Sequence, residues 1–309
     1  MWANRQVRNI DADQTLATIE KRGIHPDSVL FITLDSCRYD TFVRAQAPHL
    51  KSIGPLIEAE APATFTLPSH TAMFVGITPR VGQSREAFLN PTVGRIFRLA
   101  SRIAPGKPDD YIQVEGKNII DGFNHIGYMT IGTAAMRWFD PQVPTCFMLT
   151  SEFQQFQYTA TDVEAQVKYL LGMMAANIGR PLFVFANIGE THTPYRHRGA
   201  TWPKNNPCVS NKLEHNNNAQ ECRDRQTWCL EFVDRQIAPL IKAFQSSGAS
   251  ILACADHGDC HGEDGLWGHC LYHEKVMKVP MVMHLRPREK KDPPMVETVR
   301  QGTREEASL

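Results

Sequence analysis

The sequence predicts an α/β fold in which a mostly parallel central sheet lies between layers of helices. Two observations support this prediction: apolar segments of strand length alternate with longer segments of helical pattern, and the strand segments are apolar on both faces. A strand that is buried on both faces is typical of a parallel sheet covered by helices on each side. Regular alternation of strands and helices indicates a doubly wound topology. With 309 residues and no linker-like segment in between, we expect a single domain.

The expected elements follow in chain order. Continuous apolar runs predict strands at 28–35, 127–135, 180–190 and 249–259. Helical patterns cover 161–177, with Thr161 or Asp162 as the cap, and 221–248, ended by Gly248. A further helix is expected to start near Pro68, because proline is favoured at the first helical position.

The main α/β domain is expected to span residues 28–287. Residues 1–27 are predicted to form an N-terminal helical extension, and the charged tail 288–309 has no helical stripe. Scattered proline and glycine predict an irregular structure for 79–122. The polar, asparagine-rich segment 197–220 is interpreted either as a lid over the active face or as a surface loop.

Composition excludes several classes of function. Lysine plus arginine equals aspartate plus glutamate, 33 each, so the basic footprint of a nucleic-acid-binding protein is missing. The N-terminal segment has no apolar stretch typical of a signal peptide, and the longest apolar runs are too short to span a membrane. Eight cysteines without a CxxC pair indicate buried thiols rather than a disulfide framework. The sequence therefore predicts a cytoplasmic protein with no nucleic-acid and no membrane partner.

Polar side chains follow three of the four predicted strands. Asp35 ends the first strand, Glu190 and His192 follow the third, and Asp256 and His257 follow the fourth. In open α/β sheets, ligands bind in the crevice at the carboxyl ends of the strands. We therefore expect these side chains to converge on one site.

The segment 256–274 is dense in carboxylates and imidazoles. Such donors typically form a Zn or Mn site, and they also accept Mg or Ca. The alternative is a polar surface loop with solvated histidines. The strand context favours a metal, because an unpaired buried acid is costly and a cation between Asp35 and Asp256 would remove that cost.

Thr66 lies in the sequence TFTLPSH, at the start of the helix expected near Pro68. A metal ion that takes its hydroxyl as a ligand would lower the hydroxyl pKa and make Thr66 a nucleophile. At or just before the helix N-cap, free backbone N–H groups would also favour an oxyanion. The alternative is that Thr66 simply caps the helix.

Four motifs, LDSCRYD, TFTLPSH, GETHTPY and ADHGD, occur in this order. Together they resemble the sulfatase-like branch of the alkaline phosphatase superfamily over residues 29–286. The resemblance implies a mixed sheet between helices and a metal-bound nucleophile that attacks a phosphate, phosphonate or sulfate ester through a covalent intermediate. It also makes the main domain a catalytic domain and the protein an enzyme.

The resemblance implies a role for each matching residue. The implied metal ligands are Asp35, Thr66, Asp256, His257 and His269, with Glu190 and His273 as further candidates. Thr66 matches the nucleophile, and His192 matches the substrate-contacting catalytic histidine, which in two-metal members binds a second ion. His70, Arg38 and Lys275 are candidates for contacts with the ester oxyanion.

The sequence departs from the sulfatase pattern at the nucleophile. Formylglycine sulfatases carry cysteine or serine there and an arginine four residues on, whereas this chain has Thr66 and His70. Threonine cannot yield the aldehyde. The preferred function is therefore a metal-dependent hydrolase of small or carrier-borne phosphate or phosphonate esters, with one tightly bound ion and a second one open. A phosphoryl-group transferase, a sulfatase-type ester hydrolase and a non-catalytic binding protein of the same fold remain alternatives.

Overall fold

The computed structural model of the chain describes residues 12–76, 118–209 and 217–287. Its centre is a seven-stranded sheet with the order β2-β9-β6-β1-β5-β3-β4. Strand β9 runs antiparallel to both of its neighbours, and the other pairs in the sheet are parallel. The predicted α/β class with a mostly parallel sheet is therefore confirmed.

All four predicted strands are present, and the sequence missed the edges of the sheet. The strands are β1 (Val29–Leu34), β2 (Ile57–Glu60), β3 (Met129–Ala134), β4 (Gln155–Tyr158), β5 (Leu182–Ile188), β6 (Ser250–Ala255) and β9 (Lys278–His284). A separate two-stranded hairpin pairs β7 (Cys260–His261) with β8 (Trp267–Gly268). The sequence missed three strands of the main sheet. The edge strands β2 and β4 alternate between half-buried and exposed residues, so they lack the continuous apolar run of a central strand. Strand β9, which lies next to β2, contains Pro280, and proline argues against a strand.

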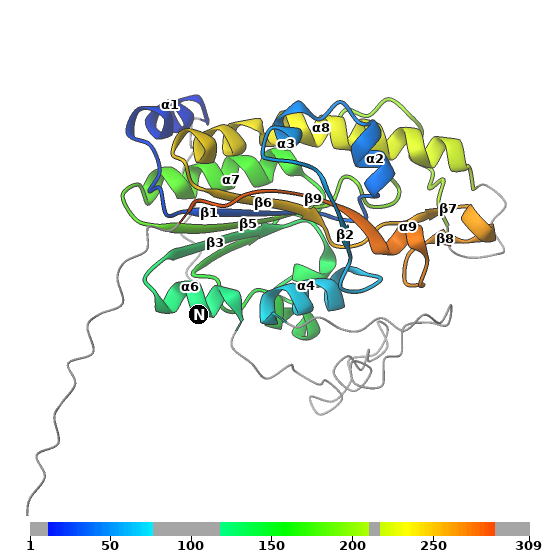
Figure 1. The fold of residues 1–309 in the computed structure, drawn as a ribbon, viewed down its shortest axis with the longest axis horizontal. Helices are drawn as coiled ribbons and strands as arrows, with labels where there is room; N and C mark the ends of the chain where they lie inside the picture. The colour runs from blue at the N-terminus through cyan, green and yellow to red at the C-terminus, as the bar shows by residue number, and fades with distance from the viewer. Residues whose placement is uncertain (1–11, 77–117, 210–216, 288–309) are drawn as a thin grey trace, which may run out of the picture.

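Helices cover both faces of the sheet (Figure 1). One face carries α1 (Ala12–Arg22), α2 (Tyr39–Arg44), α3 (Pro48–Lys51), α7 (Val163–Ala176) and α8 (Ala219–Ser246), and the other carries α4 (Thr66–Val75) and α6 (Ile119–His125). The short helix α9 (Glu274–Met277) lies near the β7-β8 hairpin, and 3-10 turns occur at η2 (Arg137–Phe139), η3 (Pro144–Leu149) and η4 (Glu263–Gly265).

The ends of the helices show which sequence signals operate. Of the two candidate caps of α7, Asp162 is the one used: its carboxylate accepts from the backbone N of Ala165 at 3.0 Å. Helix α8 starts after Asn218 and continues through Pro239 to Ser246. Within the segment 79–122, expected to be irregular, α6 begins at Ile119 because Asn118 caps it; residues 77–117 lie outside the described part of the chain.

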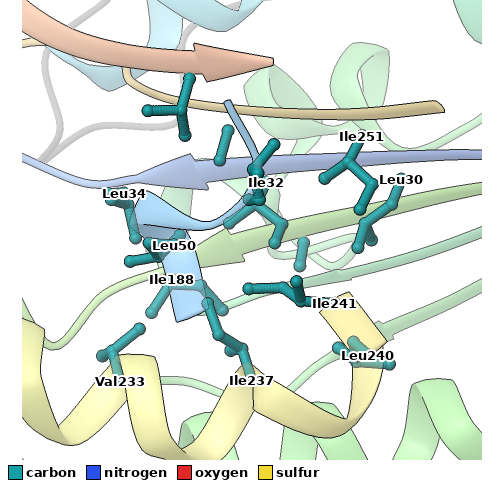
Figure 2. Close-up of a cluster of buried hydrophobic side chains, with 14 of the residues drawn as sticks. Leu30, Ile32, Leu34, Leu50, Ile188, Val233, Ile237, Leu240, Ile241 and Ile251 are labelled. Atoms are coloured by element: carbon teal, nitrogen blue, oxygen red, sulfur yellow. The ribbon is translucent and has the colours of Figure 1, made fainter. Parts of the chain in front are cut away.

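Strict alternation along β1 divides the core in two. Leu30, Ile32 and Leu34 pack toward α7 and α8 (Figure 2), whereas Phe31 belongs to the cluster on the α4 and α6 side. Because successive side chains of a strand point to opposite faces, Thr33 and Asp35 lie on the α4 side as well. This places the acid that ends β1 on the same face as the helix that carries Thr66.

The described parts of the remaining segments are limited. The structure describes the N-terminal extension from α1 onward, and it describes the segment 197–220 except for residues 210–216. The tail 288–309 lies outside the described residues. The seven cysteines whose side chains the structure describes are free thiols, and all of these but Cys270 are buried. Among the described helices, none combines the length and apolar character that a membrane crossing requires.

Candidate active site

Two buried acids lie side by side at the carboxyl ends of β1 and β6. The last paired row of the sheet matches Leu34 with Ala255, so Asp35 and Asp256 each come one residue after it, on neighbouring strands. Parallel strands lie about 4.8 Å apart, and the pleat directs both side chains to the α4 face. Both residues are 0% exposed. The sheet therefore brings two carboxylates together where water does not solvate them.

The charges of these two acids are coupled. Burial alone would raise the pKa of Asp35, but the surrounding histidines, His192 and His257 first, hold that pKa below its usual value. Burial, followed by the negative charge of Asp35, raises the pKa of Asp256 well above its usual value. Both causes disfavour two ionised carboxylates at this place, and a cation between them would offset that cost.

One oxygen of this pair and one nitrogen of the adjacent His257 have no hydrogen-bond partner. The Nδ1 of His257 donates to the carbonyl of Gly258 at 3.0 Å, so its Nε2 carries a lone pair. That Nε2 lies 3.9 Å from Asp35 Oδ1 and 3.6 Å from Asp256 Oδ2. Both His257 Nε2 and Asp256 Oδ2 are buried and unpartnered. Burial lowers the pKa of His257 to about 4, which keeps the ring in its neutral, ligating form.

These atoms fit a divalent cation. One ligand atom from each of Asp35, Asp256 and His257 lies within 4.8 Å of the others. Asp256 Oδ1 accepts from the backbone N atoms of Ser36 at 3.1 Å and His257 at 2.9 Å, which fixes the carboxylate and leaves Oδ2 for an ion. Buried polar atoms without a partner are rare, and a metal ion accounts for both of them here.

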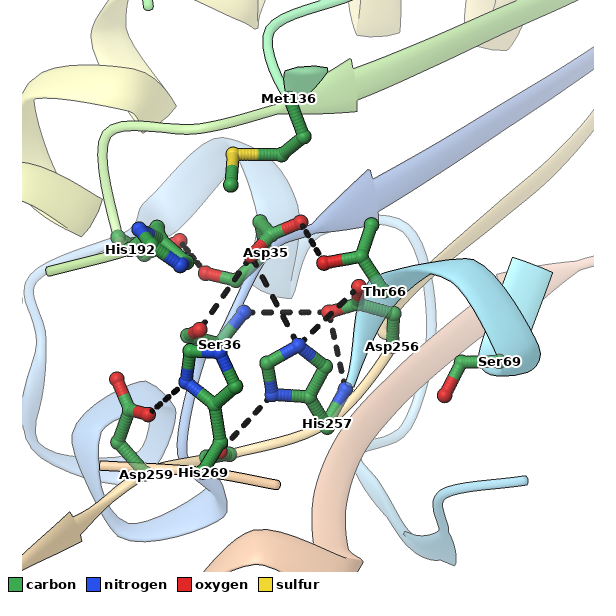
Figure 3. Close-up of polar contacts among 12 residues, drawn as sticks. Asp35, Ser36, Thr66, Ser69, Met136, His192, Asp256, His257, Asp259 and His269 are labelled. Atoms are coloured by element: carbon green, nitrogen blue, oxygen red, sulfur yellow. Dashed lines mark hydrogen bonds and ion pairs between the residues drawn. The ribbon is translucent and has the colours of Figure 1, made fainter. Parts of the chain in front are cut away.

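Thr66 reaches this group from the first turn of α4. Phe65 is the N-cap, Thr66 is the first helical residue, and its Oγ1 donates to Asp35 Oδ2 at 3.2 Å (Figure 3). The hydroxyl therefore does not cap the helix, and Thr66 lies one position later than expected. Asn187, on β5, donates to the same Asp35 oxygen at 3.4 Å. The structure thus places a hydroxyl, two carboxylates and an imidazole around one point.

His70 lies beneath Thr66, in the next turn of α4. Its Nδ1 donates to the Thr66 carbonyl at 2.8 Å, and its Nε2 accepts from the Thr33 hydroxyl at 2.9 Å. Burial lowers its pKa to about 4, and its ring packs edge-on against Phe139. With both nitrogens occupied, His70 anchors the first turn of α4 to β1.

His192 and His269 complete one side of the site. The Nδ1 of His192 donates to the carbonyl of Thr193 at 2.7 Å, which leaves its Nε2 free of that bond. The ring of His269 lies with its centre 5.2 Å from that of His192 and 4.5 Å from that of His257. The Nδ1 of His269 is 2.7 Å from Asp259 Oδ1, and Asp259, His257 and His269 form a second group of possible ligands.

Glu190 and His273 lie in other surroundings. Glu190 Oε1 accepts from the backbone N of Val163 at 2.7 Å, at the first turn of α7. His273 caps α9, where its Nδ1 accepts from the backbone N of Lys275 at 3.0 Å. Neither residue belongs to the possible ligand groups found among the described residues.

Arg38 and Lys275, which were expected to contact the ester oxyanion, both bind Asp40. The Arg38 guanidinium donates to both oxygens of Asp40, at 2.8 and 2.6 Å, and lies 2.8 Å from Glu263. Lys275 Nζ donates to Asp40 Oδ2 at 3.2 Å. The predicted oxyanion contacts of these two residues therefore compete with existing ion pairs.

Sequence reasoning missed the glutamine that holds the site loops. Gln226 Nε2 donates to the carbonyls of Ser36 at 2.8 Å and Thr191 at 3.0 Å, and its Oε1 accepts from the Thr41 hydroxyl at 2.6 Å. This one side chain of α8 joins the loops after β1 and β5. A signal was present, because Gln226 occupies the apolar stripe of α8, four residues before Leu230.

Comparison with known proteins defines the class of fold. No protein-family model and no curated protein sequence matches the chain. Similar solved structures include the C-terminal periplasmic domain of phosphoethanolamine transferase EptC from Campylobacter jejuni, with TM-score 0.57, 13% identity, and coverage of 85% of this chain and 80% of that one. The phosphonate monoester hydrolase of Agrobacterium radiobacter has a TM-score of 0.58 and 13% identity, with coverage of 84% of this chain and 68% of that one. The periplasmic domain of EptC from Escherichia coli in complex with Zn has a TM-score of 0.52 and 13% identity, with coverage of 86% of this chain and 74% of that one.

Sulfatases are also among the similar structures. The chain therefore has the fold of the alkaline phosphatase superfamily, as its motifs indicated. The similar structures named above include a phosphonate hydrolase, phosphoethanolamine transferases and sulfatases.

The same comparison corrects the predicted location. Structures with this fold include periplasmic domains of EptC from two bacteria, and this finding contradicts the prediction of a cytoplasmic protein. The cytoplasmic prediction was therefore wrong. It depended on the lack of an apolar stretch in the N-terminal segment and on apolar runs too short to span a membrane, and neither observation distinguishes one aqueous compartment from another.

Proposed function

We propose that this protein is a metal-dependent enzyme that cleaves a phosphate or phosphonate ester, with Thr66 as the nucleophile. The observation that carries the proposal is the pair of unpartnered buried atoms, Asp256 Oδ2 and His257 Nε2, next to Asp35 and the Thr66 hydroxyl. Two carboxylates and one imidazole suit Zn or Mn, and a similar solved structure is a complex with Zn. Small or carrier-borne phosphorus esters are the proposed substrates.

Asp35, Asp256, His257 and Thr66 would hold one divalent ion. When bound, the ion would lower the pKa of the Thr66 hydroxyl and neutralise the paired carboxylates. The hydroxyl hydrogen points at Asp35 Oδ2, the atom placed to receive it. His70 fixes the Thr66 backbone from below, so the nucleophile is held before the substrate arrives.

The reaction then proceeds on Thr66. Its oxygen forms a bond to phosphorus as the bond to the alcohol leaving group breaks, which leaves a phosphorylated Thr66; water releases the product in a second step. His192 Nε2, free because Nδ1 donates to the Thr193 carbonyl, is available to the phosphoryl oxygens. His269 lies beside it.

Replacing the nucleophile tests this proposal. Thr66→Ala is expected to lower turnover of p-nitrophenyl phosphate monoester, diester or phenylphosphonate ester by about 10³-fold or more in the presence of Zn or Mn. The matched control is Thr71→Ala in the same helix, whose hydroxyl bonds only to the Leu67 carbonyl at 2.8 Å and which should retain activity. Acid-quenched wild-type protein should carry phosphate on Thr66 by mass spectrometry. Full activity of Thr66→Ala would rule out this mechanism.

Transfer of the phosphoryl-linked group to a second hydroxyl is the other candidate, because phosphoethanolamine transferases are among the similar structures. Both reactions share the first step on Thr66 and differ in what attacks next. An alcohol added as acceptor would distinguish them: a transferase forms a new ester, and a hydrolase releases free phosphate or phosphonate whether or not the acceptor is present.

A further inference from the structure

A chain of hydrogen bonds reaches His269 from the side away from the nucleophile. Asp259 is fully buried, and both of its oxygens accept a bond: Oδ1 from His269 Nδ1 at 2.7 Å and Oδ2 from the Tyr195 hydroxyl at 2.7 Å. The Tyr195 oxygen also lies 3.0 Å from His261 Nε2. Tyr195 is 0% exposed, so water does not compete for these bonds.

The direction of each bond follows from the donors available. An ionised carboxylate only accepts, so His269 Nδ1 and the Tyr195 hydroxyl are both donors to Asp259. The single hydroxyl hydrogen of Tyr195 is then used, and His261 Nε2 must be the donor to the tyrosine oxygen. The hydrogens on His269 Nδ1 and on the Tyr195 hydroxyl therefore both point at Asp259, and the hydrogen on His261 Nε2 points at the Tyr195 oxygen.

These hydrogen bonds join parts of the fold that are distant in sequence. Tyr195 lies in the segment after β5, His261 ends β7, Asp259 directly precedes β7, and His269 directly follows β8. The hairpin pairs Cys260 with Gly268, which sets Asp259 and His269 next to each other. The hydrogen bond between them is thus built into the register of the hairpin.

We propose that Asp259 and Tyr195 are positioning residues that hold His269 toward the reacting ester. With Nδ1 bound to Asp259, the ring turns its Nε2 away from that acid and into the group around Asp35 (Figure 3). This orientation makes Nε2 available to an oxygen of the substrate or leaving group. The role in turnover rests on the proposed function; the orientation of the ring does not.

The same residues have a second interpretation, as ligands of another metal ion, because His257, Asp259 and His269 lie within 4.8 Å of one another. The hydrogen bonds argue against it. His269 Nδ1 is already bound to Asp259, and His257 Nε2 faces the first group of ligands, so the three residues do not present three free ligand atoms to one point. The structure therefore assigns this group to orientation and predicts one ion per chain.

Nuclear magnetic resonance of the histidine rings tests the orientation without any turnover. Protein labelled with ¹⁵N in histidine and loaded with one equivalent of Zn should show a hydrogen-bonded Nδ1 proton on His269, assigned by its loss in His269→Ala. Asp259→Asn and Tyr195→Phe should each shift or remove it. Tyr128→Phe is the matched control, because that hydroxyl donates to an exposed carbonyl away from the site, Asp27 O at 3.0 Å. A His269 ring without a proton on Nδ1, or a second equivalent of Zn bound at this ring, would overturn the proposal.

Kinetics test the consequence for catalysis. Asp259→Asn should lower kcat by about 10- to 100-fold with little change in KM, as for other residues that orient a functional histidine. In a His269→Ala background the same change should have no further effect on kcat, because the residue that it orients is gone. Equal losses in both backgrounds would show that Asp259 acts through the fold alone and would overturn the proposal. If no ester is turned over and the ring signals behave as expected, the proposed function fails and the orientation stands.

Discussion

At the level of single residues, burial and hydrogen bonding set the charge of each ionisable group. Asp35 and Glu190 both follow buried strands, yet they differ in their surroundings. Asp35 is surrounded by histidines that hold its pKa down, whereas burial raises the pKa of Glu190 from 4.5 to about 7. Glu190 Oε2 has no hydrogen-bond partner. The same type of residue in similar sequence positions therefore has opposite effects on stability.

Glu190→Gln is expected to change how stability depends on pH. Because the folded state holds the Glu190 proton more tightly than the unfolded state, the wild-type free energy of unfolding should fall as pH rises from 4.5 to 7, by about 3 kcal/mol from this residue. Glutamine does not ionise and can still accept from the Val163 amide. The free energy of unfolding of the variant minus that of wild type should therefore be larger at pH 8 than at pH 5. Denaturant unfolding of both proteins with chelator at the two pH values measures this, and a difference that does not vary with pH would contradict it.

At the level of elements, the loops at the strand ends need close backbone packing. Gly258 separates the proposed ligand His257 from Asp259, and its N donates to the carbonyl of Val276 at 2.8 Å. A Cβ atom at this position would lie 2.1 Å from the carbonyl oxygen of Lys275. That oxygen belongs to the backbone of α9, so the loop itself would have to move. Glycine is therefore required between the two functional side chains.

Gly258→Ala should lower the free energy of unfolding by about 1 to 3 kcal/mol and reduce metal affinity, because the loop that carries His257 shifts. The control is Gly122→Ala in α6, where an added Cβ meets nothing within 4 Å and alanine favours the helix. Chemical denaturation and a metal titration provide the two measurements. Equal behaviour of the two variants would show that the contact with Lys275 is not limiting.

At the level of the whole molecule, the proposed metal site has a cost in stability. Asp35 and Asp256 are brought together by the register of β1 and β6, and their repulsion is a cost of the metal-free fold. A metal that binds only the folded state returns stability by mass action, about 2.7 kcal/mol at a concentration 100 times its dissociation constant.

Asp256→Asn should therefore have opposite effects in two conditions. With chelator, the variant should be more stable than wild type, because burial and Asp35 disfavour the charge of Asp256 and asparagine carries none. With Zn or Mn, wild type should gain several degrees in melting temperature, whereas the variant should gain little. Asp234→Asn is the control, since this buried acid lies away from the site, where its oxygens accept from the backbone N atoms of Leu50 at 2.7 Å and His49 at 3.3 Å: it should keep its response to metal. A variant less stable than wild type with chelator would contradict the proposed repulsion.

The sequence alone determined the α/β class, the four central strands and the set of residues around Asp35. Continuous apolar runs and period-3.6 patterns are local properties, so they can be recognised in the sequence without knowledge of the fold. The motifs at the strand ends brought Thr66, Asp256 and His257 into one hypothesis for the same reason: the carboxyl ends of parallel strands meet at one edge.

Only the tertiary structure decided what each side chain contacts. It showed that the Thr66 hydroxyl points at Asp35, that Glu190 binds the start of α7, that Arg38 pairs with Asp40, and that Tyr195 and Asp259 hold His269. It also supplied the edge strands, whose half-exposed patterns carry no strong signal. The physical reason is the same in each case. Burial and partners depend on residues far apart in the chain, and these quantities set the charge, the orientation and the chemistry of a site.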